Sequence, residues 1–63
     1  MEPSAVAELQ ELLAGVPLPS ERATLVRYAL HQDARGEHVA LLQRLPDRWF
    51  ESLDEVTEEL LRL

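Results

Sequence analysis

The 63-residue sequence contains no cysteine, no lysine and no isoleucine, and it has only three aromatic residues. Without cysteine, neither disulfide bridges nor a thiolate metal site can hold the fold together. No apolar run approaches the ~20 residues that a membrane-spanning helix requires. The first four residues carry no basic stretch of the kind that opens a secretory signal. We therefore expect no membrane span and no secretory leader, and a cytoplasmic location.

The length corresponds to one small domain. Hydrophobic residues make up 46% of the chain, and leucine dominates them. Small domains without disulfides or metals are marginally stable because much of their surface stays in water. The chain must therefore pack its leucines tightly or share them with a partner.

Charge is unevenly distributed along the sequence. Twelve acidic residues face six basic ones, all arginine, for a net charge of −6. Residues 1–19 hold three acids and no base, and residues 47–63 hold six acids and two arginines. Residues 20–46 hold three acids and four arginines, so the middle of the chain is slightly basic. An acidic chain lacks the field that attracts phosphate backbones, so we do not expect non-specific nucleic-acid binding.

Apolar residues recur at helical spacing, and no alternating run of useful length indicates a strand. We predict an all-α fold, a compact four-helix domain with short loops. The expected helices cover residues of about 4–14, 20–33, 36–45 and 52–62.

Local signals mark the helix ends. Ser4 and Ser20 are expected N-caps, and Gly15 can take the left-handed conformation that follows a helix. The four residues from Ser52 to Glu55 have the pattern of a capping box. One helix could instead run from Ser20 to residue 45, since glycine costs only about 1 kcal/mol inside a helix. We favour a break at residues 33–36, because so long a helix would be hard to bury in a chain of this size.

Most large apolar side chains fall on inward-facing stripes of these helices, and Phe50 is expected in the core. Trp49, Leu61 and Leu63 have no such place. Trp49 could close the end of the bundle or lie in an interface, and these three residues together could form a patch for self-association.

Basic residues form a second candidate surface. Arg27, His31 and Arg35 recur at four-residue steps in the second helix and the segment after it. They could bind a phosphate or an acidic partner, or they could be a solvated face whose arginines pair with nearby acids. Two histidines, His31 and His38, would lie roughly 10 Å apart on a continuous helix, so one metal could bridge them only if the chain folds back between them. We expect no metal, no cofactor and no catalytic activity.

The order of short motifs resembles a known family. These motifs are Gly15-Val16-x-Leu18-Pro19, Leu25-Val26-x-x-Ala29, Ala34, Glu37-x-Val39, Leu41-Leu42-x-x-Leu45-Pro46-Asp47-Arg48, an aromatic residue, Ser52 and Asp54-Glu55-Val56. The order resembles a family of short bacterial domains of unknown function, DUF2795, over roughly Leu9 to Leu60. The resemblance implies an all-helical bacterial cytoplasmic domain and supports the break near Ala34. It brings no catalytic residue with it. This chain departs from the family pattern at Trp49, where a charged residue is more usual.

These observations favour a non-enzymatic interaction or regulatory module whose partner is another protein or a second copy of the chain. The alternative is a helix-turn-helix regulator that binds nucleic acid through Arg27, His31 and Arg35. The two hypotheses differ in whether these arginines are free of carboxylate partners.

Overall fold

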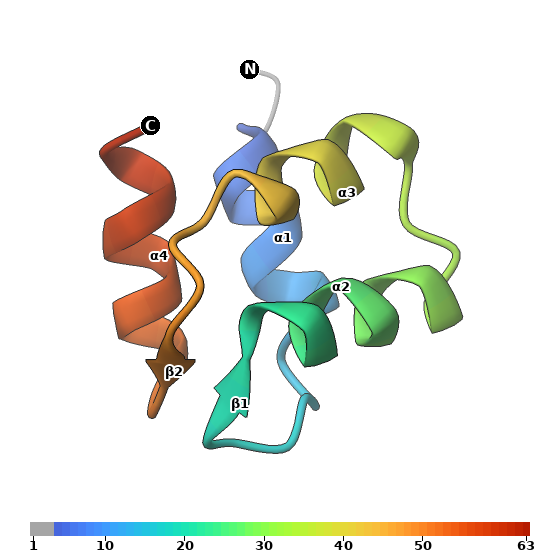
Figure 1. Ribbon diagram of the computed structural model, residues 1–63. Helices are drawn as coiled ribbons and strands as arrows, with labels where there is room; N and C mark the ends of the chain where they lie inside the picture. The colour runs from blue at the N-terminus through green and yellow to red at the C-terminus, as the bar shows by residue number, and fades with distance from the viewer. Residues whose placement is uncertain (1–3) are drawn as a thin grey trace.

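The computed structural model describes residues 4–63, so the expected absence of a leader, which concerns residues 1–4, falls largely outside the described residues. Over residues 4–63 the chain forms four helices and two short strands (Figure 1). In chain order these are α1 (Ala5–Leu12), β1 (Ser20–Glu21), α2 (Arg22–His31), α3 (Gly36–Gln43), β2 (Trp49–Phe50) and α4 (Leu53–Leu61). None of the helices in the described residues is both long and apolar enough to cross a membrane.

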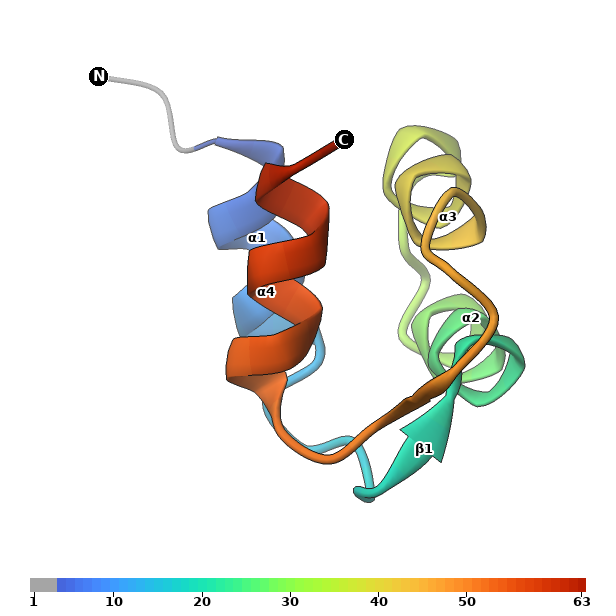
Figure 2. The same cartoon turned by 60° about the vertical axis from the view of Figure 1, so that its left-hand side comes forward.

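The helices are arranged as two pairs, joined at one end by the strands. Helix α1 packs beside α4, and α2 packs beside α3 (Figures 1 and 2). Strands β1 and β2 pair antiparallel, with Ser20 opposite Phe50 and Glu21 opposite Trp49. The prediction of a purely all-α fold is therefore wrong in this respect. Two-residue strands have no periodicity of their own, and their pairing depends on contacts between segments about 30 residues apart.

The core lies between the two helix pairs and receives side chains from every helix. Phe50 is the largest of its fully buried side chains. Its expected place in the core is confirmed, whereas the neighbouring Trp49 is mostly exposed. The buried hydrophobic residues are Leu9, Leu13, Val16, Leu25, Ala29, Leu42, Leu45, Phe50, Val56 and Leu60.

Two of the three predicted serine caps are confirmed. The backbone N–H of Ala7 donates to the Ser4 hydroxyl at 3.1 Å, and that of Glu55 donates to the Ser52 hydroxyl at 3.4 Å. Ser20 is not an N-cap, because it lies in β1 and its hydroxyl donates to the carbonyl of Pro17, in the connector between α1 and β1 (residues 13–19). Residue 21 caps α2 instead, without a side-chain hydrogen bond.

The chain turns between α2 and α3 at the stretch where the sequence favoured a break. Asp33 adopts the left-handed conformation there, with φ of 58°. The backbone N–H of Ala34 donates a hydrogen bond to the carbonyl of Ala29 at 3.1 Å. This bond satisfies a carbonyl that the end of α2 leaves without an intrahelical donor. Aspartate is among the few residues other than glycine that tolerate this conformation.

Gly15 is needed for space rather than for backbone freedom. Neither of the glycines in the described residues has a positive φ, so the expected left-handed role of Gly15 is wrong. A Cβ at this position would lie 2.8 Å from the Tyr28 hydroxyl, which is closer than real Cβ contacts allow. Gly15 therefore permits the connector to pass against the tyrosine of α2.

Replacing Gly15 with alanine should lower the free energy of unfolding by about 1 kcal/mol, because the Tyr28 ring must tilt away. In a Tyr28→Phe background the same replacement should be neutral or slightly stabilising, since alanine reduces the entropy of the unfolded chain. Urea denaturation of the four proteins gives both values. Equal effects of Gly15→Ala in the two backgrounds would contradict the contact with the hydroxyl.

Phe50→Leu should lower the free energy of unfolding by about 1 to 2 kcal/mol, because it leaves unfilled volume in the core. Trp49→Ala, its matched control in the same strand, should cost much less. Thermal and urea unfolding followed by circular dichroism compare the two variants. A larger loss for the Trp49 variant would contradict the assignment of Phe50 as the buried member of the pair.

Candidate interaction surfaces

Four large hydrophobic side chains in the described residues remain exposed to solvent. The exposed fractions are 58% for Trp49, 69% for Leu61, 45% for Leu63 and 57% for Leu30. The first three are the hydrophobic residues for which the sequence offered no place in the core. Leu30 fits the inward-facing stripe of the second helix by its spacing, and its exposure was not expected. The core instead takes Leu25 and Ala29 from that helix.

The exposed residues do not form one patch. Trp49 belongs to β2, which lies at the end of α4 where that helix begins (Figures 1 and 2). Leu61 and Leu63 lie at the opposite end of α4, about 12 Å further along its axis. The three residues therefore belong to two separate surfaces. One lies on the two-stranded ribbon formed by β1 and β2, and the other lies at the C-terminal end of α4.

The basic stripe ends with α2. Arg27 and His31 are exposed on this helix, and Leu30 lies between them on the same face. Arg35 is the N-cap of α3 and forms an ion pair at 3.7 Å with Glu37, both side chains being largely exposed. Two of the three predicted basic residues therefore share a helix face, and the third belongs to the next element.

Helices α2 and α3 run side by side in opposite directions (Figures 1 and 2). The arrangement is that of an αα-hairpin.

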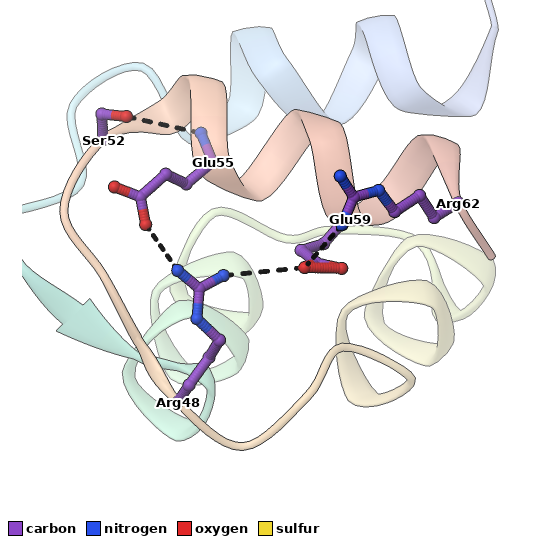
Figure 3. Close-up of polar contacts among 5 residues, drawn as sticks. All are labelled: Arg48, Ser52, Glu55, Glu59 and Arg62. Atoms are coloured by element: carbon purple, nitrogen blue, oxygen red, sulfur yellow. Dashed lines mark hydrogen bonds and ion pairs between the residues drawn. The ribbon is translucent and has the colours of Figure 1, made fainter.

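Arg48 forms ion pairs with two acidic residues of α4 (Figure 3). One guanidinium nitrogen lies 2.7 Å from the Glu55 carboxylate, and the other lies 3.7 Å from that of Glu59. Arg62 adds a contact of 3.6 Å to Glu59, and the Arg48 guanidinium lies 4.6 Å from the centre of the Phe50 ring. These contacts connect the loop before β2 to the helix after it.

The four acidic residues of α4 divide between two sides of the helix. Glu55 and Glu59 are half-buried and turned toward Arg48, whereas Asp54 and Glu58 are exposed. The Glu55 carboxylate accepts a hydrogen bond from Arg48, and among the described residues it accepts none from the backbone N–H of Ser52, so the capping box is incomplete. The Ser52 half of the box forms, and the other half is replaced by an ion pair.

A buried histidine connects the two helix pairs. His38 of α3 is only 5% exposed, and its Nε2 lies 2.8 Å from a carboxylate oxygen of Glu8 in α1. The geometry does not make a hydrogen bond, so Nε2 has no such partner in the part of the chain that the structure describes. We regard the pair as a close electrostatic contact. The spacing of His38 to Leu42 and Leu45 was the signal that could have placed this histidine on the inward face.

Residues 4–63 contain no detected pocket and no group of three or more histidine, cysteine or acidic residues arranged to hold a metal. His31 and His38 lie on different helices, one exposed and one buried. The surfaces that remain as candidates are therefore formed by side chains on the outside of the helices and the ribbon.

These features define a class of small, mostly helical domain with a filled core, a two-stranded ribbon and exposed apolar side chains. Residues 4–57 match the family described as "Protein of unknown function (DUF2795)", and the chain belongs to this family. The resemblance seen in the sequence is thereby confirmed. No curated protein and no solved structure matches the chain.

Replacing Glu8 with alanine should lower the free energy of unfolding by about 1 to 2 kcal/mol, because it leaves a buried imidazole nitrogen without any polar neighbour. The double variant Glu8→Ala/His38→Leu should recover most of this loss, since both polar groups are then removed. Glu11→Ala, an exposed residue of the same sequence region, is the control. Additive effects of the two substitutions in urea denaturation would contradict the contact.

Proposed function

We propose that this protein is a non-enzymatic module that binds a protein partner, either another protein or a second copy of the chain, through its exposed apolar side chains. The observation that carries the proposal is the exposure of Trp49, Leu61 and Leu63 in a chain whose core is already filled. Single exposed hydrophobic residues are ordinary on protein surfaces. Here two leucines lie two positions apart at one end of α4, and the single tryptophan lies on a strand.

Trp49 is well suited to anchor such a contact. Tryptophan is enriched among the residues that dominate binding energy at protein interfaces. Trp49 lies on β2, and its backbone is held in the ribbon opposite Glu21. A side chain presented from a fixed backbone loses little conformational freedom on binding, which favours affinity.

The location proposed for the module is the cytoplasm of a bacterium. The support is the absence of cysteine and the character of the family that the sequence resembles.

The test is affinity capture from a lysate of the cells that encode the protein. Wild type is compared with Trp49→Ala and with Leu61→Ser/Leu63→Ser, and Glu51→Ala serves as an exposed control. We expect a specific protein to be retained by wild type and the control, and to be lost with at least one of the two apolar variants.

Equal capture by all four proteins would contradict a role for these side chains. Binding of duplex DNA at low salt, measured by fluorescence anisotropy and lost in Arg27→Glu, would instead favour the nucleic-acid alternative.

A further inference from the structure

Helices α2 and α4 carry solvent-facing stripes of the same spacing. On α2 the stripe consists of Ala23, Arg27 and Leu30, and on α4 it consists of Asp54, Glu58 and Leu61. In each helix the members follow one another by four and then three residues, so they lie on one face. All six residues are exposed, and each stripe has its leucine at the carboxyl end.

The two stripes carry opposite charges. Arg27 on α2 corresponds in position to Glu58 on α4, and each precedes its leucine by three residues. Among the described residues, neither of these two side chains forms an ion pair. The half-buried acids of α4 differ in this respect, because they are already engaged by Arg48. The outer charges are therefore free for a contact outside the molecule.

The stripes cannot meet within one copy. Helix α2 belongs to one helix pair and α4 to the other (Figure 2). The residues of both stripes are exposed to solvent. Their complementarity can be used only between two molecules.

We propose that the α2 stripe of one copy docks against the α4 stripe of a second copy. In a parallel arrangement Leu30 contacts Leu61, Arg27 lies beside Glu58, and the small side chain of Ala23 faces Asp54. This inference rests on the proposed function and names its partner as the same chain. Its support is the matched spacing, the exposure of both leucines and the opposite charge of the two faces.

The contact joins two different faces, so it is heterologous. It closes into a ring or dimer if the rotation between copies permits, and otherwise continues as a chain of molecules. One pair of short helices buries less area than a stable complex requires, so association is weak and concentration-dependent. Because exposed charges contribute to it, raising the salt concentration weakens it.

Sedimentation velocity of the full chain at low salt, from micromolar concentrations up to about 1 mM, tests the proposal. Wild type should associate as concentration rises. Arg27→Glu alone and Glu58→Arg alone should each weaken association about fivefold, since an attractive pair becomes a repulsive one. The double variant Arg27→Glu/Glu58→Arg should restore it. Arg44→Glu and Glu51→Arg, exposed charges outside both stripes, serve as matched controls and should associate like wild type. Circular dichroism confirms that each variant is folded.

A wild-type protein that stays monomeric over the whole range overturns the inference, as does a double variant that remains as weak as the single ones. Loss of association in Trp49→Ala with none in the charge variants also overturns it, because the contact would then involve the ribbon. If the chain is monomeric but the capture experiment retains another protein, the proposed function stands and the self-association fails. If neither experiment finds a partner, both fail.

Discussion

The burial of Phe50 within a two-residue strand is the contact that joins the two halves of this molecule. Helices α1 and α4 form one pair and α2 and α3 form the other, and the β1–β2 ribbon connects them at one end. Strand β1 leads directly into α2, and β2 lies just before α4. Pairing the strands therefore holds the start of α2 beside the start of α4. The Phe50 side chain fills the space between the two helix pairs. Because the chain has no cysteine, no disulfide can hold the two pairs together instead.

Electrostatic contacts on two sides of the core also connect separate segments of the chain. Arg48 lies over the Phe50 ring and engages the two half-buried acids of α4, so the loop before β2 is connected to the helix after it. At the other side, the contact between His38 and Glu8 connects α3 to α1. Ion pairs between partly exposed groups add little to stability individually. Their effect is to set the direction of the side chains, which leaves one face of α4 acidic and free.

Much of the helical architecture could be predicted from the sequence because its signals are local. At positions 4 and 52 a serine hydroxyl caps a helix by accepting a hydrogen bond from the backbone N–H of the third residue after it. Proline at position 46 cannot continue a helix, and the weak stretch before Gly36 is where the chain turns. These features depend on a few adjacent residues, so a single sequence contains them.

The ribbon and the surfaces could not be predicted in the same way. Ser20 looks like an N-cap because its local context is that of one, and only the distant Phe50 makes it part of a strand. The role of Gly15 depends on Tyr28, and the burial of His38 depends on α1. Leu30 fits an inward stripe by spacing, but the core of a small domain has room for only part of so wide a stripe. In each case a contact between distant segments decides the outcome.

If the ribbon joins the two helix pairs, it must unfold together with the helices. Trp49 is the single tryptophan and belongs to β2, so its fluorescence reports on the ribbon, whereas far-ultraviolet circular dichroism reports on the four helices. Urea unfolding of the unmodified protein should give the same midpoint with both signals, because a two-state domain loses all its structure at once. A tryptophan transition at clearly lower urea than the helical transition would contradict the claim that the ribbon joins the two helix pairs.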